Sequence, residues 1–559
     1  MGQPNPSTAL ARVVIDELAR GGVRLAVVSP GSRSAALAIA ASSHEAITTV
    51  VSIDERSAGF HALGWAKATG APAALICTSG TAPANYLPAV VEASMSLASL
   101  VVVSADRPDE LRGVGANQTI DQTELYGAHV RLFSQIGAPD ASSDANLAWR
   151  STVSGIVAAA RGALGKPGPA HLNVAFREPT VPVTDDGRTV GEIYPFDVSG
   201  SEHRIRDRTP PTAALEVAEG ACGVVIAGEG RYDRARLRSA ASRLGWPVLA
   251  TALSGLRGDA DVVTAYHHLL AGGVPDRLRP SVVYAVGSLS PSDRLEALVA
   301  SGDQRIRIDY WGRHIDPARN ATNVIHADPA ATLEALADAP RCGPEWARRW
   351  EAADQSVIAA IDEHLGPNAA SSGAAVASAL NLAGWEVLVA ASSLPIREVD
   401  AHIRRRGTVI ANRGASGIDG FVSTALGVAR SAHGTVALAG DLSLLHDSNG
   451  FLIDPRPDMV VVVIDNGGGG LFDSLPTAAH APDYERLFVT PHHRDLAALS
   501  AFHRLNYREA DNARDVIASV DDGLATSGVS LIRVAVDRSD DLATRRKLDR
   551  IGSDLASRL

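Results

Sequence analysis

Cysteine is scarce in this sequence, with only Cys77, Cys222 and Cys342 among 559 residues. The three lie far apart and none belongs to a C-x-x-C pair, so their spacing gives no sign of a zinc site or a redox dithiol. Sparse cysteine usage is typical of proteins in a reducing compartment. We therefore expect a cytoplasmic location.

Long apolar runs and an excess of positive charge are also lacking. The N-terminus, Met-Gly-Gln-Pro-Asn-Pro, has no charged segment leading into an apolar one, and no apolar run approaches the roughly 18 residues of a membrane span. The net charge of -11 repels phosphate backbones and anionic lipids. We expect neither a membrane span nor a nucleic-acid partner, and small molecules are the expected ligands.

What the sequence does contain is typical of a folded globular protein. Hydrophobic residues make up 46% and charged residues 21%. A chain of this length exceeds what one hydrophobic core normally supports, so we expect several domains.

Short apolar runs rich in β-branched residues recur in three sets, separated by helical patterns such as 7–20 and 55–69. The alternation predicts an α/β protein with three doubly wound parallel-sheet domains. The first set of predicted strands is 25–29, 73–78 and 100–105. The second set is 222–227, 248–251, 282–286 and 306–309. The third set is 386–391, 408–411, 435–439, 459–465 and 530–536. A segment rich in proline and charge predicts a linker at 181–211, between domains at 1–180, 212–345 and 346–559.

The most informative motif is Gly440-Asp441-Leu442, at the end of one predicted strand, followed by Asp465-Asn466-Gly467-Gly468 at the end of another. Ligands of open parallel sheets bind outside the carboxyl ends of strands, so both polar groups are expected in one crevice. Carboxylate and amide oxygens suit a hard cation such as Mg²⁺. The alternative is that Asp441 begins a helix and 465–468 is a simple turn.

A second candidate is Glu55, which follows a short predicted strand and starts a helix. A lone glutamate in a first helical turn often does no more than interact favourably with the helix dipole. The distal motif gives it another interpretation, because the two together resemble thiamine-diphosphate enzymes. In that chemistry a carboxylate hydrogen-bonds the aminopyrimidine ring, while an Asp and Asn pair holds the metal and diphosphate.

More of the chain resembles one family of such enzymes, the menaquinone-pathway 2-succinyl-5-enolpyruvyl-6-hydroxy-3-cyclohexene-1-carboxylate synthases. The similarity lies in short segments spread over most of the chain. These are Ser29-Pro30-Gly31-Ser32-Arg33-Ser34, Ile53-Asp54-Glu55-Arg56, Thr78-Ser79-Gly80-Thr81-Ala82, Ser104-Ala105-Asp106-Arg107-Pro108, Gly115-Ala116-Asn117-Gln118-Thr119-Ile120, Leu253-Ser254-Gly255-Leu256-Arg257, Ser393-Leu394-Pro395-Ile396-Arg397 and Asn412-Arg413-Gly414-Ala415-Ser416-Gly417-Ile418-Asp419-Gly420. The resemblance implies pyrimidine-binding, central Rossmann-like and diphosphate-binding domains, in that order.

The resemblance also implies an activity. Such enzymes decarboxylate 2-oxoglutarate on thiamine diphosphate and add the succinyl-semialdehyde carbanion to isochorismate. The cofactors implied are thiamine diphosphate and Mg²⁺, with Mn²⁺ as a possible replacement. The active sites lie at subunit interfaces, which implies a homodimer or homotetramer.

Site residues follow from the same resemblance, taken with the chemistry of each side chain. Both substrates are dicarboxylates, and guanidinium groups in loops at strand ends can grip carboxylates through two parallel hydrogen bonds. The expected catalytic and substrate-binding residues are Glu55, Arg33, Arg107, Gln118, Ser393, Arg397 and Arg413. The expected cofactor-binding residues are Glu55, Ile418, Gly440, Asp441, Leu442, Asn466, Gly468, Phe472 and Leu475. The expected metal ligands are Asp441, Asn466 and the Gly468 carbonyl. An arginine taken alone is more often a surface or structural residue, and Ile418 taken alone could be an ordinary core residue.

The sequence departs from the family pattern in places. Leu442 and Asp465 stand where the motif usually has glycine and asparagine, and Asp293 precedes Arg294 where relatives often carry a basic residue. Two other functions are left open. One is an acetolactate-synthase-like enzyme or simple 2-oxo acid decarboxylase with the same cofactor. The other is a nucleotide-binding protein, based on Gly228-Glu229-Gly230, although position 233 is Asp and completes no G-x-G-x-x-G motif.

Overall fold

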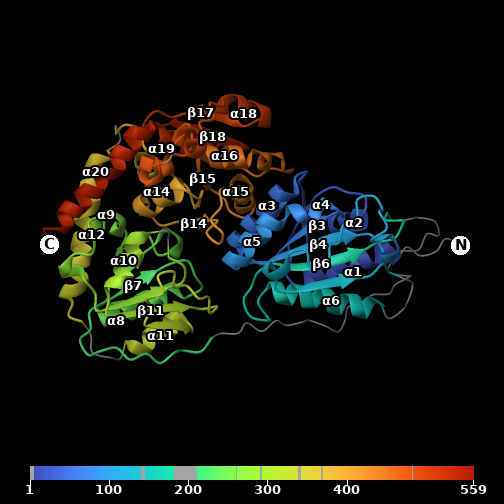
Figure 1. The fold of residues 1–559 in the computed structure, drawn as a ribbon, viewed down its shortest axis with the longest axis horizontal. Coiled ribbons are helices and arrows are strands. Elements are labelled where there is room, and N and C mark those ends of the chain that lie inside the picture. The colour runs from blue at the N-terminus through green and yellow to red at the C-terminus, as the bar shows by residue number, and fades with distance from the viewer. Residues whose placement is uncertain are drawn as a thin grey trace. The chain divides into compact units, whose positions relative to one another are not determined.

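The structure is a computed structural model that describes residues 6–139, 145–181, 210–259, 261–289, 292–337, 342–366, 369–480 and 482–558. The predicted linker at 181–211 lies almost entirely outside the described residues. The chain divides into two compact units (Figure 1). The first consists of residues 1–208, 412–433 and 443–459, and the second of residues 209–411, 434–442 and 460–559.

The first unit contains a six-stranded sheet in the order β2-β1-β3-β4-β6-β5. Its strands are β1 (Leu25–Val28), β2 (Thr48–Val51), β3 (Ala73–Cys77), β4 (Leu100–Asp106), β5 (Phe133–Ile136) and β6 (Ala170–Ala175). Its helices are α1 (Pro6–Arg20), α2 (Ala35–Ser42), α3 (Glu55–Thr69), α4 (Thr81–Asn85), α5 (Leu87–Ser96) and α6 (Ala145–Ala160). The central strands are buried, as a parallel sheet covered on both faces requires. Figure 1 shows α1 and α6 together along one face of this sheet.

Helix α3 begins because Asp54 caps it, accepting the backbone N–H groups of Arg56 and Ser57. It ends at Gly70, which has a φ of 71°. Its partner in the first unit is α15 (Phe421–Ala429), followed in the same unit by most of α16 (Asp441–His446) and by the 3₁₀ helix η5 (Ser448–Leu452). The helix that carries Glu55 is therefore packed against a segment more than 350 positions later in the chain.

The second unit contains two further sheets of six strands. The first of these has the order β12-β11-β10-β7-β8-β9. Its strands are β7 (Gly223–Ala227), β8 (Val248–Ala250), β9 (Val262–Val263), β10 (Val282–Val286), β11 (Gln304–Asp309) and β12 (Asn323–His326). Its helices include α8 (Arg234–Leu244), α9 (Tyr266–Leu269), α10 (Asp293–Ser301), α11 (Pro329–Leu336) and α12 (Glu345–His364). A disulfide joins Cys222 to Cys342, a pairing for which the sequence spacing gave no signal.

The other sheet of the second unit has the order β14-β13-β15-β16-β18-β17. Its strands are β13 (Val387–Ala390), β14 (Thr408–Ala411), β15 (Thr435–Gly440), β16 (Met459–Asp465), β17 (Asn506–Glu509) and β18 (Val529–Ala535). Around it lie α13 (Gly373–Ala379), α14 (Leu394–His402), α17 (Thr477–His480), α18 (Leu496–His503), α19 (Ala513–Leu524) and α20 (Arg538–Ala556), with short helices η6 (Gly470–Ser474) and η7 (Glu485–Val489). Adjacent β15 and β16 end at Gly440 and Asp465, so the two halves of the predicted metal motif meet at one edge.

The three parallel six-stranded sheets with interleaved helices confirm the predicted α/β fold class. None of the helices in the described ranges combines the length and apolar character needed to cross a membrane. The predicted domain boundaries remain predictions, since the division into units follows packing and assigns α15 to the first unit.

Candidate active site

Two carboxylates and an imidazole converge where β15 and β16 end. The Oδ2 atom of Asp441 lies 3.2 Å from Nε2 of His492, and Oδ1 of Asp465 lies 3.9 Å from the same nitrogen. Burial, together with the negative charge of Asp465, raises the pKa of Asp441 to about 6. A dication would relieve this repulsion, and these are donor types that Mg²⁺ or Mn²⁺ accepts.

The loop after β16 opens beside these carboxylates. Gly467 has a φ of 76°, and a Cβ at that position would meet nothing within 4 Å, so the backbone leaves open space there. The Oδ1 atom of Asn466 accepts the N–H of Gly468 at 3.2 Å. A cavity of about 460 Å³ lies here, lined by Asp465, Asn466, Gly467, His492, His493, Arg494, Arg533, Ala535, Val536 and Asp537. Phosphate groups and a cation could both be accommodated at this edge of the sheet.

Glu55, in the first unit, starts α3 as predicted. Its side chain is half-buried, and burial followed by the nearby charge of Asp54 raises its pKa. Close to it is the fully buried Cys77, whose thiol pKa is raised by burial and by the negative charge of Glu55. Glu55 is therefore a carboxyl group that holds a proton more readily than one in water, which suits a partner for a ring nitrogen.

Three of the predicted substrate residues lie together in the first unit. The Nη1 atom of Arg107 donates to Ser79 Oγ at 2.8 Å, and Gln118 Nε2 donates to the Ser79 carbonyl at 2.9 Å. Burial, and next the positive charge of Arg33, lowers the pKa of Arg107. Arg33 itself is buried and donates from Nη1 to the Phe176 carbonyl. The Nη2 atom of Arg33 lies 3.2 Å from Oε1 of Glu178, whose side chain is largely exposed, so one carboxylate already faces this arginine. Guanidinium groups of this kind can bind carboxylates.

A second group of predicted residues lines a cavity of about 990 Å³ in the second unit. Arg397 and Leu475 line it, together with Arg294 of α10. Arg397 was expected in a loop, and that expectation is wrong. The residue lies in the first turn of α14, which begins just after Ser393, and its Nη1 donates to the Ser393 carbonyl at 2.6 Å. The helix holds the guanidinium at the cavity wall.

The family of thiamine pyrophosphate enzymes matches this chain over residues 8–125, with its N-terminal TPP binding domain. A 2-succinyl-5-enolpyruvyl-6-hydroxy-3-cyclohexene-1-carboxylate synthase of Thermobifida fusca is 41% identical, over 97% of this chain and 98% of its own length. Proteins of the same name from Saccharopolyspora erythraea and Halobacterium salinarum are 40% and 38% identical, over 90% and 99% of this chain and 91% and 99% of their own lengths.

This chain belongs to the 2-succinyl-5-enolpyruvyl-6-hydroxy-3-cyclohexene-1-carboxylate synthase family. Membership in this family fits the three parallel sheets. It also fits the carboxylates at the ends of β15 and β16 and the glutamate at the start of α3. Asp441, Asp465 and His492 are donor types that could hold a divalent ion, and the open backbone at Gly467 leaves room for a diphosphate.

Asp465 stands where the family motif usually has asparagine, and an ion pair explains how the extra carboxylate is accommodated. The Oδ2 atom of Asp465 lies 2.6 Å from Nε of Arg533 on β18, and this ion pair raises the pKa of the arginine. The extra carboxylate is thus held and neutralised by a neighbouring strand. Asp441 has no arginine or lysine partner of this kind among the described residues, so its carboxylate is the better candidate for a metal ligand.

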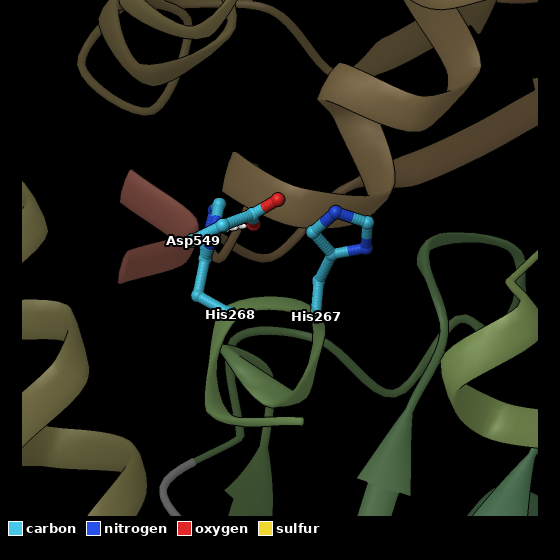
Figure 2. Close-up of side chains that lie close together, drawn as sticks. All are labelled: His267, His268 and Asp549. Carbon is cyan, nitrogen blue, oxygen red and sulfur yellow. Dashed lines mark hydrogen bonds and ion pairs between the residues drawn. The ribbon is translucent and has the colours of Figure 1, made fainter. Parts of the chain in front are cut away.

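The wall of the larger synthase cavity contains a cluster that the sequence did not reveal. Figure 2 shows Asp549 of α20 reaching towards His267 and His268 of α9. The Nδ1 atom of His268 lies 3.0 Å from Asp549 Oδ1. Although these are metal-ligand types, Arg294 donates to both oxygens of Asp549, at 2.9 and 2.6 Å. The carboxylate is already neutralised, so the cluster orients Arg294 in the cavity wall.

A buried arginine connects this cavity to the central sheet of the synthase. Arg257 donates from Nε to the Ala250 carbonyl at 3.0 Å and from Nη2 to the Asp400 carbonyl at 2.7 Å. Asp400 also accepts the Tyr266 hydroxyl at 2.7 Å. Because Asp400 belongs to α14, this network fixes the helix that carries Arg397. Arg257 came from a family motif, but its structural task was not predicted.

The remaining predicted residues divide between the two units. Arg413 and Ile418 follow β14 in the segment that belongs to the first unit. Gly440, Leu442, Gly468 and Phe472 lie with Asp441 and Asn466 in the second. His492 and Ser79 were missed as site residues: His492 is separated from both motifs in sequence, and Ser79 was quoted only as part of a family segment.

The nucleotide-binding alternative finds no support at the end of β7. The N–H groups of Gly228 and Glu229 donate to the carbonyls of Val286 and Ser288 at 2.9 and 2.8 Å. A Cβ at Gly228 would lie 2.3 Å from the Ser288 carbonyl oxygen. The backbone groups that a dinucleotide's phosphates would need are therefore already used, and the approach is closed by the end of β10.

Proposed function

We propose that this chain decarboxylates 2-oxoglutarate and transfers the remaining four-carbon unit to isochorismate, releasing CO₂ and 2-succinyl-5-enolpyruvyl-6-hydroxy-3-cyclohexene-1-carboxylate. The proposal rests on the family names of the relatives. The structural observation that carries it is the presence of two buried arginines, Arg33 and Arg107, near enough for the charge of Arg33 to lower the pKa of Arg107. Ser79 joins Arg107 to Gln118. Two guanidinium groups in one buried place suit a dicarboxylate better than pyruvate.

Thiamine diphosphate, when bound, supplies the electron sink that makes loss of CO₂ from a 2-oxo acid possible. The residues proposed to hold its diphosphate and a Mg²⁺ or Mn²⁺ ion are Asp441, Asn466 and the carbonyl of Gly468, with Gly440, Leu442, Phe472, Leu475 and Ile418 in contact with the organic part. The donor chemistry at the ends of β15 and β16 supports this assignment.

Glu55 is proposed to hold a proton against the ring nitrogen of the aminopyrimidine. The support is its position at the start of α3 and its pKa, which burial raises above the usual range. Arg33, Arg107 and Gln118 are proposed to orient one carboxylate-bearing substrate, while Arg397, Ser393 and Arg413 bind the other. The two arginine groups neutralise charge, and Leu475 adds an apolar side chain to the wall of the larger cavity.

We further propose a homo-oligomer, a dimer or tetramer, whose active sites combine residues of two subunits. Glu55 and the metal-binding pair belong to different compact units. Beside Glu55, the side chains of Ile53 and Val51 are 66% and 41% exposed, which is unusual for apolar residues next to a functional carboxylate. A partner subunit covering this surface would bury them and complete the site. We also propose that the protein is cytoplasmic.

The experiment combines purified protein with thiamine diphosphate, Mg²⁺, 2-oxoglutarate and isochorismate, and measures CO₂ release together with isochorismate loss. Equal rates of the two are expected. Turnover of pyruvate in preference to 2-oxoglutarate would support the acetolactate-synthase-like alternative instead.

The role of Glu55 is tested with Glu55→Gln, which keeps the size of the side chain but cannot share an acidic proton. We expect normal folding and unchanged binding of thiamine diphosphate with Mg²⁺ within about threefold, with decarboxylation reduced by at least about 100-fold, the lower range for loss of an acid–base group. Glu45→Gln, at an exposed position of the same unit, is the matched control. Full activity of Glu55→Gln would refute the role.

A further inference from the structure

Glu92 is a buried carboxylate for which the proposed chemistry has no use. It lies in α5 and only 2% of its surface is exposed. Its Oε1 accepts the backbone N–H of Gly414 at 2.9 Å, and its Oε2 accepts those of Ala415 at 2.6 Å and Ser416 at 3.4 Å. A single side chain therefore binds three consecutive N–H groups of a segment more than 320 positions away, within the same compact unit.

A lysine of another helix, α3, compensates the negative charge of Glu92. Lys67, near the end of α3, places Nζ 3.3 Å from Glu92 Oε1, and both side chains are almost fully buried. A buried carboxylate is costly unless it is paired and hydrogen-bonded, and this one is both. Both carboxylate oxygens of Glu92 are thus directed at one turn of the 412–420 segment.

That turn needs external support because its own geometry provides little. No helix or strand includes Gly414, Ala415 or Ser416, and Ser416 has a φ of 67°, which a residue with a side chain adopts at a cost. The turn also lies directly against α5, since a Cβ at Gly414 would be 2.7 Å from the Glu92 carbonyl oxygen. Its N–H groups find their acceptor in the Glu92 carboxylate.

We propose that Glu92 is a positioning residue: by binding the turn at 414–416, it holds Arg413 on one side and Ile418 on the other at the substrate and cofactor positions. This inference rests on the proposed function, in which Arg413 binds a substrate carboxylate and Ile418 supports the cofactor. Glu92 touches neither ligand and acts through the backbone of the turn. Lys67 orients the carboxylate through its ion pair with Oε1.

Glu92→Gln is the direct test, because it preserves volume but replaces one acceptor oxygen with an NH₂ group. That group cannot accept the N–H bonds of the turn or pair with Lys67. The first readout is amide hydrogen exchange in the 412–420 peptide, measured on the full-length protein without ligands. We expect exchange at 414–416 to become at least tenfold faster than in the wild type.

The second readout is steady-state kinetics, which separates positioning from a purely structural role. A misplaced Arg413 should raise the KM of at least one dicarboxylate substrate about tenfold. A purely structural role would lower only the amount of folded enzyme, which reduces apparent kcat and leaves KM unchanged. The matched control is Asp328→Ala, which removes a carboxylate that accepts two N–H groups at the start of α11 in the other unit. It should change neither readout.

Gly414→Ala approaches the same contact from the opposite side and leaves every charge in place. Its added Cβ should push the turn off α5 and reproduce both effects, which keeps the proposal testable if Glu92→Gln folds poorly. Wild-type exchange rates at 414–416 in the folded variants would overturn the proposal, and so would an unchanged KM for both substrates. Hydrogen exchange needs no substrate, so an inactive wild type would overturn the proposed function while leaving the positioning of the turn to be judged by exchange.

Discussion

Gly64 of α3 lies directly against the backbone of Thr424 in α15. A Cβ built on Gly64 would be 2.0 Å from the Thr424 carbonyl oxygen, closer than any real contact. The same happens in reverse at Gly427, where a Cβ would lie 2.0 Å from the His61 carbonyl oxygen. The backbones of the two helices are therefore in direct contact. This contact joins α3, which begins at Glu55, to α15, which directly follows the 412–420 segment.

Gly64→Ala should therefore destabilise the protein, although alanine normally favours a helix over glycine by about 1 kcal/mol. The clash is with main-chain atoms that cannot rotate away, so we expect a cost at the upper end of the typical 1–3 kcal/mol for overpacking, or above it. Thermal or urea unfolding measures the change. Gly155→Ala in α6, where a Cβ meets nothing within 4 Å, is the control and should stabilise slightly. Equal effects of the two substitutions would contradict this account.

Periodicity and family motifs predicted the strands well because the runs buried on both faces are nearly all apolar. The runs at 25–29, 100–105 and 459–465 each match an observed strand to within one residue. Edge strands β5, β9, β12 and β17 were missed, because they are short or half-exposed and lack that signal. The buried strand β6 was also missed, because His171 and Asn173 interrupt its apolar run. The assignment of α15 to the first unit could not be predicted either, since it depends on glycine contacts at Gly64 and Gly427 that only the three-dimensional packing reveals.

Site residues followed a similar rule. The placement of Asp441 and Asn466 at one edge of the sheet was predictable because each directly follows a strand, and neighbouring parallel strands end at the same edge. His492 and Glu92 were not, because their partners lie 51 and more than 320 positions away and no motif surrounds them. Arg397 was expected in a loop at a strand end, but α14 begins at Leu394 and includes Pro395. Proline is well tolerated in the first turn of a helix, where it in fact stands.

The two carboxylates beside His492 should differ in their importance for metal binding. Asp441→Asn removes the charge that we assign to the metal, and should weaken Mg²⁺-dependent binding of thiamine diphosphate about 100-fold or more. Asp465→Asn restores the residue usual in the motif and should leave binding within a few-fold, although Arg533 then loses its partner. Isothermal titration of both variants with thiamine diphosphate, with and without Mg²⁺, checks the difference. Equal losses would show that both carboxylates bind the metal.

Asp354 should make the folded protein less stable as pH rises through the mildly acidic range. Burial raises its pKa to about 6, despite the N–H groups of Ala265 and Thr264 that it accepts. The unfolded value is about 3.9, so between about pH 4 and 6 the folded state holds a proton that the unfolded state has lost. Stability from this group is present below pH 4 and falls by about 3 kcal/mol at most by pH 7.

Asp354→Asn keeps the acceptor oxygen and removes the charge, so its stability relative to the wild type should be greater at pH 7 than at pH 4. Urea unfolding at both pH values measures this difference. Asp276→Asn removes the same charge from a side chain that is 97% exposed and provides the control. A difference that is independent of pH, or that is larger at pH 4, would contradict the expected direction.

The disulfide between Cys222 and Cys342 should make stability depend on redox conditions. It closes a loop of 120 residues in the second unit, with a Cα–Cα distance of 5.0 Å that is normal for such bonds. In the chain-entropy account, a loop of about 100 residues contributes about 4.7 kcal/mol by restricting the unfolded chain. A mild reductant should therefore lower the Tm of the oxidised protein. Cys222 is partly exposed, which gives the reductant access.

Thiol counting in denaturant without reductant gives an independent measurement. One reactive thiol, that of buried Cys77, is expected from the oxidised protein, and three after reduction. Cys222→Ser combined with Cys342→Ser should unfold at the temperature of the reduced wild type and should not respond to reductant. Cys77→Ala should respond as the wild type does, because its thiol takes no part in the bond. Three reactive thiols in protein purified without reductant would mean that the pair stays reduced where the protein is made, as the low cysteine content predicts for a reducing cytoplasm.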